Sequence, residues 1–203
     1  MSLHAALEPA VEEAGLSRRL KERTTAAHQR LDRSIMAGAP FADRARYGRF
    51  LAVQQSFHAD IEALYADPGL GRLLPDLAAR SRLSAIENDL ADLGVEASAP
   101  SDGPAFPAGA PFDDAEALGW LYVAEGSNLG AAFLLKEAAK LGLSTEFGAR
   151  HLAPAPDGRG LNWRVFAAAL DAVPLDADGA ARAVAGAEAA FARVQGLVRA
   201  SFG

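Results

Sequence analysis

The chain has no cysteine among its 203 residues. This absence excludes disulfide-stapled folds, thiolate zinc sites, cysteine-ligated iron–sulfur clusters and cysteine nucleophiles. A bound metal would therefore need histidine or carboxylate ligands. Aromatic residues are also scarce, at 7% of the chain, whereas alanine is abundant. That composition favours helices, because alanine loses no side-chain entropy in a helix.

The chain also has few basic residues and no long apolar run. Twenty Lys and Arg residues against 26 Asp and Glu residues give a net charge of −6, which argues against a general nucleic-acid-binding protein with its basic surface. No apolar run approaches the roughly 20 residues of a membrane-spanning helix. Residues 1–13 carry three glutamates and no lysine or arginine, unlike a signal peptide. We therefore expect a cytoplasmic protein without membrane or nucleic-acid partners.

Apolar positions recur every three to four residues through most of the chain, which predicts an all-α, single-domain bundle of about seven helices. Residues 1–16 are expected to be a flexible segment and residues 17–203 the domain. A loop rich in proline and glycine is expected at 94–112, as a tether inside the bundle. The clearest helices are expected at 17–35, 43–65, 76–93, 114–143, 162–172 and 176–202, with Ser17 and Asp43 as N-caps.

His28 is the first residue that invites a chemical interpretation. It shares a helical stripe with Leu20, Leu31 and Ile35, so its imidazole is expected to point inward. A lone histidine on such a stripe is more often a core residue than a ligand. Asp32, one turn later, can accept the Nδ1 proton and leave Nε2 for a metal. A solvated Asp32 that pairs with a nearby arginine fits the sequence equally well.

Gly126 and Gly130 lie one turn apart inside a segment that is otherwise strongly helical. Each glycine costs about 1 kcal/mol relative to alanine in a helix interior. One explanation is close packing against another helix. The other is a flat ligand that lies against the backbone where the helix kinks, with Ser127 and Asn128 supplying hydrogen-bonding groups. Opposite a metal-competent His28, these glycines would form a slot for a planar macrocycle.

Two distant segments resemble the bacterial biliverdin-producing heme oxygenases, of the type associated with bacteriophytochromes. They are LKERTTAAHQRLD at 20–32 and YVAEGSNLGAA at 122–132. The resemblance extends from about residue 17 to the C-terminus and includes GLNWRVF at 160–166. It is specific because both motifs occur, and in the family's order.

The resemblance implies a heme-oxygenase-like bundle that cleaves heme to biliverdin, CO and Fe²⁺ with O2 and an external electron donor. Heme b would be both cofactor and substrate. It would lie between a proximal helix that carries the axial ligand His28 and a distal helix kinked at Gly126 to Gly130. Asp32 would meet the second nitrogen of His28. Lys21 and Tyr122 stand where the bacterial enzymes hold the heme propionates.

The distal side departs from one branch of the family. Animal members carry an aspartate directly after the first glycine of the kink, where this chain has Ser127. The sequence therefore leaves open which groups would hydrogen-bond to water on the distal side of the heme. The candidates are Ser127, Asn128 and backbone carbonyls.

The resemblance also implies partners: a ferredoxin or flavin reductase as electron donor, and a bacterial phytochrome as a possible acceptor of biliverdin. A basic cluster on the acidic chain could steer the donor to the proximal side, although a solvated helix face explains the same charges. This cluster consists of Arg18, Arg19, Lys21 and Arg23.

Two other functions stay open at the level of sequence. A heme carrier or sensor would keep His28 as a ligand without turnover, and a helical interaction protein would bury His28 in its core. The remaining histidines are expected at a flexible end (His4), in a core or rim hydrogen bond (His58) and in a loop (His151).

Overall fold

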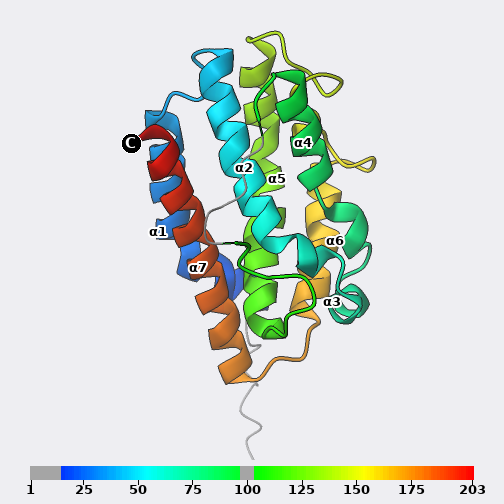
Figure 1. Ribbon diagram of the computed structural model, residues 1–203. Coiled ribbons are helices and arrows are strands. Elements are labelled where there is room, and N and C mark those ends of the chain that lie inside the picture. The colour runs from blue at the N-terminus through cyan, green and yellow to red at the C-terminus, as the bar shows by residue number, and fades with distance from the viewer. Residues whose placement is uncertain (1–14, 97–102) are drawn as a thin grey trace, which may run out of the picture.

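A computed structural model describes residues 15–96 and 103–203. Within these residues the chain forms seven α-helices and two short 3-10 helices, with no strand (Figure 1). This confirms the all-α prediction. The predicted flexible segment falls mainly on residues 1–14, outside the described ranges, and stays a prediction. The elements are α1 (Leu16–Ala37), α2 (Arg44–Tyr65), α3 (Pro68–Leu73), η1 (Leu77–Arg80), α4 (Leu83–Asp92), α5 (Asp114–Ala139), η2 (Arg150–Leu152), α6 (Arg159–Asp171) and α7 (Ala177–Phe202).

Side-chain caps fix several helix starts. Asp43 accepts a hydrogen bond from the amide of Arg46 at 2.8 Å, which confirms it as the N-cap of α2. Ser17 is not the N-cap of α1, because the helix already begins at Leu16. Instead, the carboxylate of Asp171 accepts from the amide of Ser17 at 2.6 Å and from its hydroxyl at 2.8 Å. A carboxylate from α6 therefore binds the first turn of α1.

Three predicted helix bounds were wrong. The segment 76–93 divides into η1 and α4, because Asp76 adopts a left-handed conformation (φ 56°) and Ser81 an extended one (ψ 139°). The short helix α3 was not predicted. The helix that contains Gly126 ends at Ala139 rather than at residue 143.

α1, α5 and α7 form the part of the bundle that matters for the site. All three run in the same direction, and both α1 and α5 pack along α7 (Figure 1). A Cβ at Gly119 of α5 would lie 2.0 Å from the carbonyl oxygen of Ala183, and one at Gly186 of α7 would lie 2.2 Å from that of Glu116. These two glycines therefore let α5 and α7 pack backbone against backbone.

Residues 103–112, which belong to the predicted loop 94–112, are fixed to α2. The amides of Ala105 and Phe106 donate to Asp60, whose carboxylate also accepts from Arg193 at 2.7 Å. Phe106 is buried and packs against Trp120. No helix within the described ranges is long and apolar enough to cross a membrane.

Candidate functional site

α1 and α5 approach each other at Thr24 and Tyr122, which are both buried. The hydroxyl of Thr24 donates to the carbonyl of Leu20 at 2.8 Å. Burial raises the pKa of Tyr122, and the nearby Thr24 only partly opposes this, so the phenol is protonated at neutral pH. Both helices run in the same direction past this point (Figure 1).

His28 lies one turn beyond Thr24 on α1. Its side chain is 59% exposed, so the prediction of an inward-pointing imidazole was wrong. The buried stripe of α1 passes through Leu31, and His28 lies roughly 60° around the helix from it. The predicted pairing with Asp32 is present, with Nδ1 and Oδ2 3.0 Å apart. The ring also packs edge-on against Phe191 of α7, with 5.9 Å between centroids.

Gly126 and Gly130 lie one and two turns beyond Tyr122 on α5. The helix continues through both of them, from Asp114 to Ala139. A Cβ at Gly126 would only reach ordinary contact with the ring of Trp163, at 3.7 Å, and one at Gly130 would meet no atom within 4 Å. Close helix packing therefore explains neither glycine.

Exposed apolar side chains flank these glycines. Leu129 is 45% exposed and Phe133 is 53% exposed. At 100° per residue, both share an arc of roughly 100° on α5 with Tyr122, Gly126 and Gly130. We call this arc the α5 face. It is apolar, and it has no side chain at Gly130, where a Cβ would meet no protein atom.

The structure does not bring every predicted distal residue to the α5 face. The hydroxyl of Ser127 donates to the carbonyl of Ala124 at 2.7 Å, roughly 100° around the helix from Gly126. Asn128 lies roughly 200° from Gly126, on the opposite side of α5. There its carbonyl accepts from Arg159 at 3.3 Å.

Lys21 lies on the His28 side of α1, two turns earlier, and is exposed. Of the basic cluster, Arg18 is paired with Glu22 at 2.9 Å, with both side chains largely exposed. Arg23 is exposed on the surface of α1, and Arg19 is half-buried.

A buried ionic network behind Gly126 was missed from the sequence. Glu125 accepts from the hydroxyl of Tyr65 and from Arg80, both at 3.0 Å. Burial raises the pKa of Glu125, and the positive charge of Arg80 only partly opposes it. The sequence could have predicted this network, because Glu125 ends the apolar run 120–125 and a buried carboxylate needs hydrogen-bonding or charged partners. The network holds α5 in place at the level of the glycines.

A second buried cluster joins α2, α4 and η2. His151 was predicted in a loop, but it lies in η2, buried, with Nδ1 2.8 Å from Asp89. His58 was predicted in the core or at its rim, and it lies in the core. Its Nδ1 has no hydrogen-bond partner among the described residues. Burial, together with the neighbouring His151 and Arg82, lowers the pKa of His58 to about 3. His4 lies outside the described residues.

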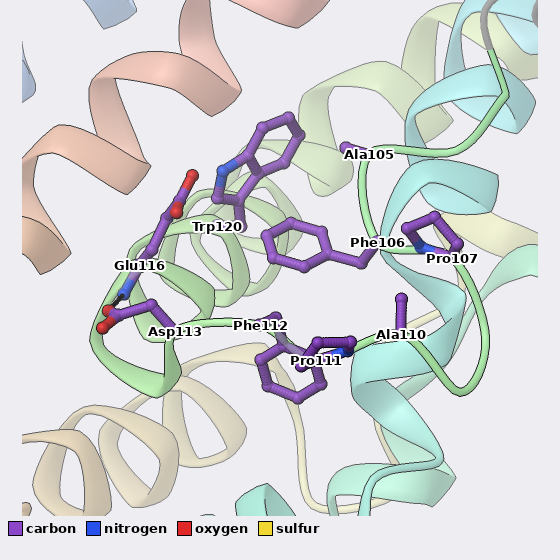
Figure 2. A pocket seen from close by; sticks show the side chains of 9 residues that line it. All are labelled: Ala105, Phe106, Pro107, Ala110, Pro111, Phe112, Asp113, Glu116 and Trp120. Atoms are coloured by element: carbon purple, nitrogen blue, oxygen red, sulfur yellow. Dashed lines mark hydrogen bonds between the residues drawn. The ribbon is translucent and has the colours of Figure 1, made fainter.

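A cavity of about 200 Å³ lies at the start of α5, away from the α5 face. Figure 2 shows Phe106, Phe112 and Trp120 around it, with Asp113 and Glu116 on one side. None of the residues that line it belongs to α1, so it is separate from His28.

Comparison with known proteins decides the family. The family model described as "Heme oxygenase" matches residues 14–200. Heme oxygenase PigA of Pseudomonas aeruginosa is 45% identical over 186 residues, which are 92% of this chain and 92% of that protein. The chain belongs to the heme oxygenase family. Heme oxygenases use heme as both substrate and prosthetic group, with O2 and an external reductant. Of the functions that the sequence left open, the enzyme is therefore the one that holds.

Solved heme oxygenases share the fold. A heme oxygenase from Neisseria meningitidis, determined with NO and CO bound, superposes with a TM-score of 0.86 and 42% identity over 93% of this chain and 92% of its own. The enzyme of Synechocystis sp. PCC6803, determined in complex with heme, superposes with a TM-score of 0.73, over 92% of each chain. At 18% identity, that second likeness concerns the fold alone.

Proposed function

We propose that this heme oxygenase binds heme between α1 and the α5 face, with His28 as the axial ligand. One pair of observations supports the proposal. α5 carries two helical glycines that no protein packing requires, and α1 carries an exposed imidazole whose Nδ1 is already paired with a carboxylate. When bound, heme supplies the redox-active iron and is itself the molecule that O2 and electrons convert to biliverdin, CO and Fe²⁺.

Asp32 and Phe191 prepare His28 for ligation. A carboxylate at Nδ1 selects the tautomer that carries its proton there, which leaves the lone pair of Nε2 for iron. Contact with Phe191 restricts the ring from the side of α7. The large exposed fraction of His28 fits this function, because a bound macrocycle would cover a side chain that the protein itself does not bury.

Lys21 and Tyr122 are assigned to the heme propionates. Lys21 offers a mobile ammonium group on the same side of α1 as His28, and it can pair with a carboxylate at the edge of the site. Tyr122 can donate a hydrogen bond because burial keeps its phenol protonated. Thr24, the buried neighbour of Tyr122 on α1, would act as a positioning residue for the Tyr122 phenol.

On the distal side, Gly126 and Gly130 leave space for the ring and for O2. Ser127 lies at the edge of this wall, and its hydroxyl oxygen can still accept a hydrogen bond from water while its proton goes to Ala124. Asn128 is assigned a backbone contribution only, since its side chain lies across the helix. Water near Ser127 would carry protons to the reaction.

The electron donor is proposed to be a ferredoxin or a flavin reductase that docks beside Arg19, which is half-buried, and Arg23, which is exposed. We place the reaction in the cytoplasm, where such donors are kept reduced. A bacterial phytochrome is the proposed acceptor of the biliverdin.

Replacing Gly130 with leucine tests the distal half of the proposal. A side chain at this position meets no protein atom, so Gly130→Leu should keep or raise the unfolding midpoint in the absence of heme. It should weaken heme binding roughly tenfold or more, because a steric conflict of about 1.4 kcal/mol already has that effect. Absorption titration with heme and urea unfolding measure the two quantities.

Gly196→Leu on α7 is the matched control. A Cβ at Gly196 also meets no atom within 4 Å, and the residue is exposed. This variant should bind heme as the wild type does. Wild-type heme affinity in Gly130→Leu would contradict the placement of heme against the α5 face.

A further inference from the structure

A groove of about 310 Å³ lies between the C-terminal halves of α1 and α7. Three arginines line it: Arg30 and Arg33 from α1, and Arg199 from α7. Ser34, Ala37 and Gln195 complete the lining. By helix geometry, Arg30 projects roughly 200° around α1 from His28. The groove is therefore a separate feature from the α5 face.

The three guanidinium groups have no carboxylate to neutralise them. None of them takes part in an ion pair with another described residue, and no acidic residue lines the groove. Elsewhere in the chain, arginines such as Arg80, Arg150 and Arg193 are each paired with a buried carboxylate. In a protein with a net charge of −6, three unpaired cations at one place repel one another and attract an anion.

The helix dipoles explain only part of this cluster. The C-terminal end of a helix attracts cations, but the effect is confined to about the last turn. Arg199 lies in the last turn of α7 and fits that explanation. The last turn of α1 contains no basic residue, so Arg30 and Arg33 lie outside it. Their position beside Arg199 needs another reason.

The floor of the groove adds a neutral donor. The side-chain amide of Gln195 donates to the hydroxyl oxygen of Ser34 at 2.9 Å. Within the described residues, the hydroxyl proton of Ser34 has no acceptor, so it can be donated into the groove. Ala37, with its small side chain, leaves the groove open at the end of α1.

We propose that this groove binds a phosphate-class polyanion, of which pyrophosphate is the simplest form. Each guanidinium offers a planar fork that matches two oxygens of a phosphate group. Three forks and one hydroxyl supply more donors than a single carboxylate can accept. The proposal does not depend on heme binding.

Calorimetric titration of the heme-free protein with inorganic pyrophosphate tests the site at constant ionic strength. We expect saturable binding of one pyrophosphate per chain. Arg33→Ala and Arg199→Ala should each weaken it roughly tenfold or more, because each removes hydrogen bonds to a charged group. The pyrophosphate affinity of Arg33→Lys should lie between those of the alanine variants and the wild type, because lysine keeps the positive charge but lacks the planar pair of donors.

Arg72→Ala on α3 is the matched control, because Arg72 is also exposed and lies outside the groove. Titration with ATP in parallel identifies the source of the phosphates. Equal affinity for ATP and pyrophosphate supports a free phosphate chain as ligand, and tighter binding of ATP supports a nucleotide. The proposal is overturned if pyrophosphate does not saturate the protein, if citrate binds more tightly, or if Arg72→Ala weakens binding as much as Arg33→Ala.

Discussion

At the residue scale, His28 shows what periodicity can and cannot decide. Its spacing from Asp32 predicted their contact, because residues four apart share one side of a helix, and the 3.0 Å pair confirms this. Its exposure could not be predicted in the same way. A residue at the edge of a buried stripe turns inward or outward according to what packs beside it, and here α5 meets α1 one turn earlier, at Thr24.

His58 should make the protein sensitive to mild acid. The pKa of His58 is lowered to about 3 in the folded state, against about 6.5 when the chain is unfolded. Between pH 6.5 and 3 the unfolded chain binds a proton that the folded protein does not. The free energy of unfolding therefore falls as the pH falls, by about 1.4 kcal/mol per pH unit from this group.

Urea unfolding at pH 7.5, 6.0 and 5.0 measures this loss. His58→Leu should unfold with a shallower pH dependence than the wild type between pH 6.0 and 5.0. His28→Ala serves as control, because it removes an exposed histidine, and its slope should match that of the wild type. Identical slopes in all three proteins would contradict the buried, neutral state of His58.

At the element scale, the glycines of α5 divide into two kinds. Gly119 is required by packing, since its Cβ would collide with the backbone of α7. Gly126 and Gly130 are not. The sequence singled out Gly126 and Gly130 as exceptions to helix propensity but could not tell packing from ligand binding, because the distinction depends on which partner helix lies opposite each residue.

Two glycine-to-alanine variants should change stability in opposite directions. Gly119→Ala places a Cβ 2.0 Å from the carbonyl oxygen of Ala183 and should lower the free energy of unfolding by about 1–3 kcal/mol. Gly196→Ala lies in open space within α7 and should raise it by up to about 1 kcal/mol. Chemical denaturation of the heme-free proteins gives both values. A stabilising Gly119→Ala would contradict the close approach of α5 and α7.

At the scale of the whole molecule, the sequence predicted the fold class and most long helices because their apolar periodicity is local information. Contacts between distant segments were beyond it. The pairs Asp60–Arg193 and Asp89–His151 join residues far apart in the chain. No local sequence pattern near either partner predicts these contacts. A shared site for the motifs in α1 and α5 was one of two alternatives that the residues left open, and the family resemblance favoured it.

Net charge bears on the electron donor at this same scale. An acidic donor is repelled by the overall charge of −6, so local positive charge on α1 has to guide it. Reversing Arg19 and Arg23 together to glutamate should lower donor-supported kcat/KM roughly tenfold at low ionic strength, with a smaller effect at high salt. Reversing Arg49 and Arg72 together to glutamate controls for net charge, because both are exposed and lie outside α1. A rate and salt dependence equal to those of the control would contradict docking at this surface.

The central claim, that His28 binds the iron of a heme lying against the α5 face, is tested most directly by the aerobic absorption spectrum of heme-loaded His28→Ala with a reductant. The wild type should lose its Soret band as biliverdin forms. His28→Ala should keep its fold, because the side chain is exposed, and should form biliverdin only when imidazole is added. Wild-type turnover by His28→Ala without imidazole would contradict the claim.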